Sequence, residues 1–139
     1  MKKAIIVLYG KANEGKTSTL KELFRLLTNI ELPTDFAEII EFRNVKIGFV
    51  TSSDPYEDNL DIFEDEIKNQ IAENCDIIIC TSRTSGRAKN FIEEIDVKYN
   101  KIWLSTILST SFDIDFFNNL HANYLHNIIN QIIDNNENL

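Results

Sequence analysis

Apolar residues follow two kinds of pattern along this chain of 139 residues. Short, almost continuous apolar runs, of which residues 3–9 (KAIIVLY) are the first, are typical of strands buried on both faces of a parallel sheet. Longer stretches repeat apolar residues every three or four positions, as amphipathic helices do. Together the two patterns predict strands over 3–9, 37–42, 45–50, 76–80 and 101–106, and helices over 16–29, 54–73, 87–95 and 115–134.

Strands that alternate with helices predict an α/β fold built around a mostly parallel sheet of five strands. Only Arg43 and Asn44 separate the second and third strands. Two residues are too few for a crossover, so we expect an antiparallel hairpin that adds one antiparallel strand at the edge of the sheet. The length is that of one domain and no linker or repeat divides it, so residues 1–139 are expected to form a single domain.

The charge of the chain limits its partners. Asp and Glu number 22 against 14 Lys and Arg, which gives a net charge of −8. This charge repels nucleic acid and anionic membranes, so we expect neither as a partner. The apolar run that begins at Ala4 stops at Gly10, too early for an export signal, and no run reaches the ~20 residues of a membrane span. The cytoplasm is therefore the expected compartment, where Cys75 and Cys80 would be buried thiols.

Residues 10–17 (GKANEGKT) lie between the first predicted strand and the first predicted helix, and they match Gly-x-x-x-x-Gly-Lys-Ser/Thr at every fixed position. The two glycines let the backbone wrap around an anion with consecutive N–H groups pointing inward. Lys16 would reach the β- and γ-phosphates of a nucleotide, and the Thr17 hydroxyl would bind Mg²⁺. The expected nucleotide-binding residues are Gly10, Lys11, Ala12, Asn13, Glu14, Gly15, Lys16, Thr17 and Ser18.

This motif resembles that of the P-loop nucleoside triphosphatases, and the likeness is specific over residues 4–20. The resemblance implies a nucleoside triphosphate with Mg²⁺ as ligands and a three-layer α/β/α fold. The early hairpin, followed by a strand that leads to Asp54, is similar to the kinase–GTPase division, which implies the strand order 2-3-1-4-5. Asp54 would then hold Mg²⁺ through water. Ahead of Pro55, Asp54 is equally suited to cap a helix, and the two roles are compatible.

The predicted strand at 76–80 has the apolar body of the strand that carries a second acidic residue in many P-loop enzymes. Cys80, Thr81 and Ser82 stand where that acid would be. This departure puts efficient hydrolysis in doubt, although it leaves nucleotide binding untouched. Asp76 opens the strand and is expected at the opposite end of the sheet, because ligands bind outside the carboxyl ends of parallel strands.

Arg83 and Arg87 lie in the polar loop that follows this strand. Beside a nucleotide, an arginine there would neutralise charge on a transferred phosphoryl group. Lys16, Arg83 and Arg87 are therefore the candidate catalytic residues; the alternative is a solvated loop in which Arg87 only opens a helix. Trp103 is expected in the core rather than beside a nucleobase.

The motif leaves the nucleotide and the reaction open. The Asn-Lys-x-Asp sequence by which GTPases read guanine is missing, and the corresponding loop, residues 81–84, reads TSRT, which favours ATP over GTP. Three classes of function remain. The first is an ATP-binding NTPase with weak or partner-stimulated hydrolysis that acts as a switch or as a subunit of an assembly. The second is a kinase of a small molecule or nucleotide. The third is a nucleotide-binding regulatory module without turnover.

Overall fold

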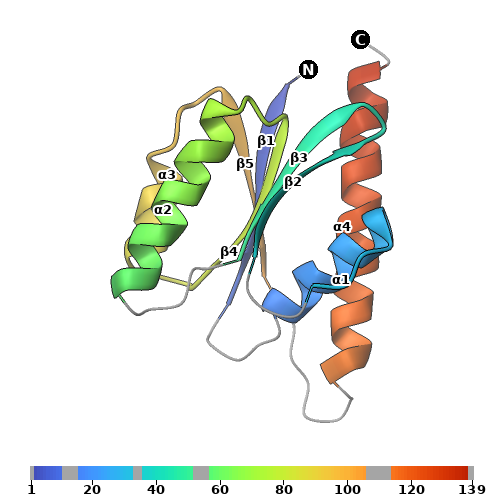
Figure 1. The fold of residues 1–139 in the computed structure, drawn as a ribbon, viewed down its shortest axis with the longest axis horizontal. Coiled ribbons are helices and arrows are strands. Elements are labelled where there is room, and N and C mark those ends of the chain that lie inside the picture. Colours follow the sequence, from blue (N-terminus) through green and yellow to red (C-terminus); the bar gives the residue numbers. More distant parts are fainter. Residues whose placement is uncertain (1, 11–15, 33–35, 52–56, 106–113, 138–139) are drawn as a thin grey trace.

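The structure is a computed structural model that describes residues 2–10, 16–32, 36–51, 57–105 and 114–137. Within these residues it contains every strand and helix that the apolar pattern predicts (Figure 1). The predicted start of the second helix at Asp54 and Pro55 lies outside the described residues. The elements are β1 (Lys3–Tyr9), α1 (Lys16–Thr28), β2 (Ala37–Phe42), β3 (Val45–Val50), α2 (Glu57–Ala72), β4 (Ile77–Ser82), α3 (Arg87–Glu93), β5 (Tyr99–Ser105) and α4 (Ile114–Glu137).

The predicted hairpin is confirmed. Strands β2 and β3 pair in antiparallel register from Ala37 opposite Val50 to Phe42 opposite Val45. Both turn residues are left-handed, with φ of 53° at Arg43 and 64° at Asn44. Two successive positive φ angles give a two-residue turn the twist that matches its flanking strands, so the chain reverses here without distorting the sheet.

The expected strand order is wrong. The order is β2-β3-β4-β1-β5, so β4 rather than β3 lies beside β1 on the hairpin side. The edge strands β2 and β5 and the antiparallel direction of β2 agree with the prediction. Only the two interior strands β1 and β4 have exchanged places relative to the order 2-3-1-4-5.

The backbone and carboxylate of Asp76 explain this arrangement. The Asp76 Oδ2 atom accepts a hydrogen bond from the Lys46 amide at 3.0 Å, and the Asp76 amide donates to the Lys46 carbonyl at 2.8 Å. On the other side, the Ala4 amide donates to the Asp76 carbonyl at 3.0 Å. Asp76 thus holds the start of β4 between β3 and β1, at the amino end of the sheet where the sequence predicts it.

Helices cover both faces of the sheet, which gives three layers (Figure 1). Helices α1 and α4 pack on one face, where Ile6 and Leu8 of β1 point into a buried cluster with Leu20 and Leu23. Helices α2 and α3 pack on the other face. There the alternate β1 residues, Ile5 and Val7, join a second cluster. A strand buried on both faces has to be apolar at every position, which is why β1 is a continuous apolar run.

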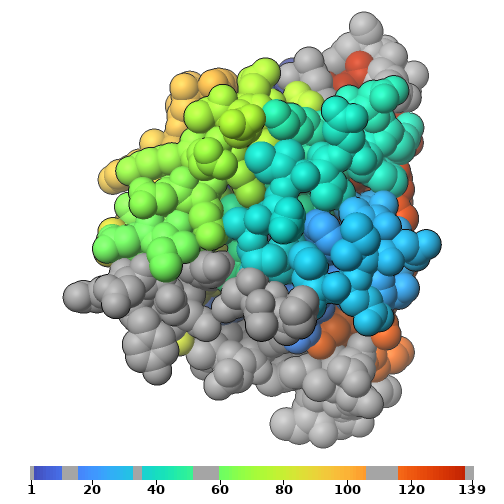
Figure 2. All heavy atoms as spheres, in the orientation of Figure 1, coloured from blue at the N-terminus to red at the C-terminus, as the bar shows by residue number. Residues whose placement is uncertain are grey.

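Long-range hydrogen bonds tie α4 to the rest of the chain. Arg43 in the hairpin turn donates to Asn130 Oδ1 at 3.0 Å and pairs with Asp134 at 2.6 Å. The Lys2 amide donates to Asn136 Oδ1 at 3.0 Å, so the first and last described residues lie at the same end of the molecule (Figure 1). Figure 2 shows α2, the hairpin and α1 side by side on one face. None of the described helices is long and apolar enough to span a membrane.

Candidate functional site

The candidate site lies at the carboxyl ends of the parallel strands. Strands β3, β4, β1 and β5 run in the same direction, so they end at one edge of the sheet. At that edge the buried Gly10 amide donates to the Ser82 carbonyl at 3.1 Å. This bond extends the pairing of β1 with β4 by one residue and fixes the first residue of the P-loop motif against the neighbouring strand.

Lys16 closes the motif. Its Nζ atom donates to the Gly10 carbonyl oxygen at 2.6 Å, across six positions of the chain. This bond joins the side chain at the start of α1 to the backbone just beyond the end of β1. Lys16 is half-buried at the first position of α1, the helix end that carries partial positive charge.

Five of the predicted binding residues, 11–15, lie outside the described residues. The motif continues into the first turn of α1, where Thr17 is half-buried and Ser18 is exposed. Behind them, the buried Thr19 hydroxyl donates to Asn118 Oδ1 of α4 at 3.3 Å. This contact holds the start of α1 against α4, so the residues that would contact phosphate and Mg²⁺ begin on an anchored helix.

The predicted metal aspartate, Asp54, also lies outside the described residues. The last described residue before it, Thr51, is buried, and its hydroxyl donates to the Phe36 carbonyl at 3.2 Å. Because β4 lies between β1 and β3, the end of β3 is two strand spacings, ~10 Å, from the end of β1. The strand order thus places the end of β3 farther from Gly10 than the expected order would.

The strand directly beside β1 carries no acid at its end. Cys80, Thr81 and Ser82 are all buried, and burial raises the pKa of the Cys80 thiol well above its usual range. The Thr81 hydroxyl donates to the Thr51 carbonyl at 3.1 Å, and the Ser82 hydroxyl donates to the Arg83 carbonyl at 2.9 Å. Across the described residues, no three His, Cys, Asp or Glu side chains gather where they would hold a metal ion.

The two candidate arginines have different surroundings. Arg87 opens α3 and forms ion pairs of 2.6 Å with Asp61 and with Glu64, both on α2. These contacts tie α3 to α2, and they support the alternative in which Arg87 stabilises the fold. Arg83 is half-buried, its Nε atom is buried, and the described part of the chain offers that atom no hydrogen-bond acceptor.

Arg83 lines a pocket of about 270 Å³ between α3 and the ends of β1 and β5. The edge of one aromatic ring meets the face of another in this pocket, with the ring centroids of Tyr9 and Trp103 6.0 Å apart. Trp103 is half-buried and packs against the second core cluster, so the expectation of a core position is confirmed in part. Its register opposite Val7 on β1 turns it toward α3 at the sheet edge. The lining residues are Tyr9, Arg83, Thr84, Lys89, Glu93 and Trp103.

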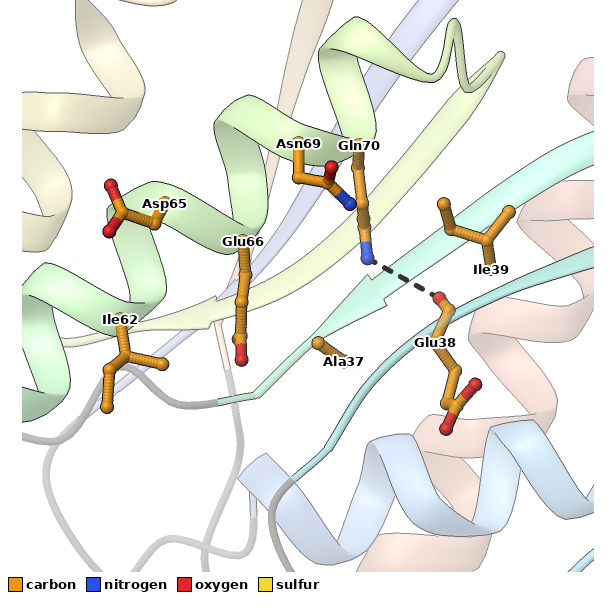
Figure 3. Close-up of a pocket in the computed structure, with 8 residues that line it drawn as sticks. All are labelled: Ala37, Glu38, Ile39, Ile62, Asp65, Glu66, Asn69 and Gln70. Carbon is orange, nitrogen blue, oxygen red and sulfur yellow. Dashed lines mark hydrogen bonds between the residues drawn. The ribbon is translucent and has the colours of Figure 1, made fainter.

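A separate hollow of about 630 Å³ lies between α2 and the edge strand β2 (Figure 3). Gln70 reaches from α2 toward the strands and donates from Nε2 to the Phe49 carbonyl at 2.9 Å and the Glu38 carbonyl at 3.4 Å. The carboxylates that line this hollow repel phosphate, so it is a poor candidate for a nucleotide site. Its lining residues are Ala37, Glu38, Ile39, Ile62, Asp65, Glu66, Asn69 and Gln70.

Sequence reasoning missed Tyr9 and Lys89 as site residues. The signal for Tyr9 is its position directly before Gly10, where a parallel strand ends at the binding edge. Lys89 carries no comparable signal, because its place follows from the way α3 packs over the sheet. Comparison of the chain with protein-family models, curated proteins and solved structures gave no match.

Proposed function

We propose that this protein binds a nucleoside triphosphate with Mg²⁺ at the loop formed by residues 10–17, and that it is an NTPase of the P-loop type. The observation that carries the proposal is the position of the motif. It lies between the carboxyl end of the buried parallel strand β1 and the first residue of α1, and Lys16 folds back onto Gly10 at 2.6 Å. When a nucleotide binds, a charged phosphate oxygen would replace the Gly10 carbonyl as the hydrogen-bond acceptor of the Lys16 ammonium group.

The roles of the other motif residues follow from their chemistry. The amides of residues 11–15 would surround the β-phosphate, and the N-terminal end of α1, which is 13 residues long, would add its positive partial charge. The Thr17 hydroxyl would be a Mg²⁺ ligand, with Ser18 beside it. Asp54 would hold the same ion through water or would cap α2.

ATP is the proposed nucleotide, because the chain lacks a guanine-reading Asn-Lys-x-Asp sequence. The net charge of −8 argues against nucleic acid and anionic membranes as partners. It also means that Lys16 and its surroundings must attract the nucleotide against a repulsive background. The cytoplasm, where Mg-ATP is abundant and where the buried Cys75 and Cys80 stay reduced, is the compartment that fits this function.

Hydrolysis is expected to be slow without a partner. The end of β4, which is directly beside Gly10, presents hydroxyls of Thr81 and Ser82 that already donate to backbone carbonyls. Because the end of β4 has no carboxylate, that strand has no acidic group to position an attacking water or to provide a second contact to Mg²⁺. A protein partner that supplies such a group would raise turnover, as expected of a switch or an assembly subunit.

Two other functions fit the same binding site. In a kinase of a small molecule or nucleotide, Arg83 would neutralise the transferred phosphoryl group, and the lack of a carboxylate partner for Arg83 among the described residues favours this alternative. In a regulatory module without turnover, bound ATP would only stabilise the fold.

Phosphate release from Mg-ATP and Mg-GTP separates these functions. The NTPase account expects slow release by the wild type that Lys16→Ala abolishes and Asp54→Ala and Arg83→Ala reduce. Release that Lys16→Ala leaves unchanged would point to a contaminant and defeat the enzymatic functions. If ATP raises the melting temperature without release, a screen of phosphoryl acceptors distinguishes a kinase from a regulatory module.

A further inference from the structure

The pocket between α3 and the ends of β1 and β5 is built from two aromatic rings and a donor-rich rim. Tyr9 and Trp103 are half-buried and contact each other edge to face, so part of each ring is open to the pocket. The rim adds the cationic groups of Arg83 and Lys89 and one carboxylate, Glu93. Aromatic faces with a few hydrogen-bonding groups at their edge suit a planar heteroaromatic ring.

Arg83 is the residue of this pocket that points most clearly to a ligand. The other three arginines of the chain, Arg25, Arg43 and Arg87, all pair with carboxylates. In a chain with 22 acidic residues, Arg83 has no such pair within the described residues, and its buried Nε atom makes no hydrogen bond there. A charged donor that is buried without an acceptor raises the free energy of the protein. A ligand that supplies the acceptor removes this cost, and its binding becomes more favourable by the same amount.

The pocket also lies next to the P-loop. Tyr9 directly precedes Gly10, and Arg83 directly follows Ser82, whose carbonyl accepts the Gly10 amide. The pocket volume of about 270 Å³ is below the ~300–1,000 Å³ of pockets that enclose a whole drug-sized ligand, so it suits one ring system of a larger molecule.

We infer that this pocket holds the nucleobase of the nucleotide whose phosphates lie on residues 10–17. The ring lies against Tyr9 and Trp103, and Arg83 donates to an acceptor at the edge of the ring. This inference rests on the proposed function, because it assumes phosphates at Gly10 and Lys16. Both common purines fit the aromatic faces, and their edges differ in donors and acceptors, so ATP and GTP are separate arms of the test.

Binding of three magnesium complexes, those of ATP, GTP and inorganic tripolyphosphate, tests the inference. Trp103 is the single tryptophan of the chain, so its fluorescence reports on this pocket alone. Calorimetry should give at least one nucleotide a roughly tenfold lower Kd than tripolyphosphate, the gain typical of stacking one base on an aromatic side chain. That nucleotide should change the Trp103 emission, and tripolyphosphate should not.

Arg83→Met should reduce the advantage of the nucleotide over tripolyphosphate, because the base loses the hydrogen bond from Arg83 while the rings of Tyr9 and Trp103 still stack on it. Arg43→Met is the matched control, because it removes the same charge at the hairpin turn. This turn precedes β3, whereas the pocket lies at the sheet edge where the parallel strands end. The control variant should therefore keep the advantage of the nucleotide over tripolyphosphate. Equal binding of nucleotides and tripolyphosphate overturns the base pocket while leaving the P-loop proposal standing. An equal loss for tripolyphosphate in Arg83→Met also overturns it, because Arg83 would then contact phosphate. If none of the three ligands binds, both proposals fail.

Discussion

The ammonium group of Lys16 donates a hydrogen bond to the carbonyl of Gly10 at 2.6 Å, so the last lysine of the P-loop motif contacts its first glycine. The pair is partly buried. Losing a hydrogen bond from a charged donor costs about 1.5–3 kcal/mol. We therefore expect Lys16→Met to lower the free energy of unfolding by about 2 kcal/mol, as measured by urea denaturation, with an unchanged m value. A decrease of more than about 3 kcal/mol in the free energy of unfolding would mean that the main role of Lys16 is to stabilise the fold rather than to bind a ligand.

Gly48→Ala tests the contact between α2 and β3. A Cβ atom at Gly48 would lie 2.0 Å from Oε1 and 2.6 Å from Cδ of Gln70. Gln70 is buried and held by its hydrogen bond to the Phe49 carbonyl, so it can move aside only by losing that bond. Overpacking of this kind costs typically 1–3 kcal/mol, and we expect a loss of about 2 kcal/mol in the free energy of unfolding.

A double-mutant cycle shows whether the steric contact is the cause. Gln70→Ala alone should also destabilise the protein, because two backbone carbonyls lose a donor. In the double variant the new methyl group occupies space that Gln70 has vacated. The double variant should therefore be more stable than the sum of the single changes by about 1 kcal/mol. Additive costs would show that Gly48 is required for another reason.

Tyr99 is predicted to weaken the fold at alkaline pH. It is buried, its hydroxyl donates to the Cys75 carbonyl at 2.7 Å, and burial raises its pKa to about 12 from the ordinary value of 10.0. The folded protein therefore keeps a proton that the unfolded chain loses above pH ~10, and this contribution to stability disappears as the pH rises from 10 to 12. Tyr99→Phe should cost about 1 kcal/mol at neutral pH and should flatten the alkaline decline. Tyr124→Phe, at an exposed site, is the control, and an equal alkaline slope for both variants would contradict the assignment.

His121 is predicted to weaken the fold at acidic pH. Burial lowers its pKa below the ordinary value of 6.5, so the folded state disfavours the charged imidazolium. The unfolded chain binds a proton first as the pH falls below 6.5, and stability is lost in that range. His121→Gln should reduce the slope of unfolding free energy against pH between about 6.5 and 5, measured by denaturant titration. His126→Gln makes the same change one turn farther along α4, and a slope that His121→Gln leaves unaltered would refute the prediction.

The apolar pattern predicts the elements of this fold well, because β1 and β4 are buried on both faces and leave continuous apolar runs. The edge position of β2 follows from the two-residue hairpin connection, and that of β5 agrees with the order implied by the family resemblance. The apolar pattern cannot order the interior strands, because β1 and β4 are equally buried and can exchange places without changing either pattern. In the observed order Asp76 bonds to Lys46 and to Ala4 at the start of β4, and periodicity does not reveal such contacts.

The candidate site could be predicted where it is local in sequence and not where it is assembled in space. Gly10 and Lys16 belong to one contiguous motif, so the sequence alone identifies both, although it does not predict the hydrogen bond between them. The neighbours of Arg83 come from β1, β5 and α3, which are far apart in the sequence. The spacing of residues along the chain therefore does not predict that Tyr9 and Trp103 lie near Arg83. The ion pairs of Arg87 with α2 are likewise contacts between helices, which the loop sequence at residues 81–87 does not encode.

Isothermal titration calorimetry of Mg-ATP with the wild type, Lys16→Met and Lys21→Met tests the nucleotide-binding proposal most directly. Lys21→Met removes the same charge from the same helix, more than a turn beyond the motif. We predict saturable binding to the wild type and to Lys21→Met, and at least a roughly tenfold weaker Kd for Lys16→Met, since a charged hydrogen bond to phosphate is lost. Binding that Lys16→Met retains in full, or the absence of any heat with the wild type at millimolar Mg-ATP, would contradict it.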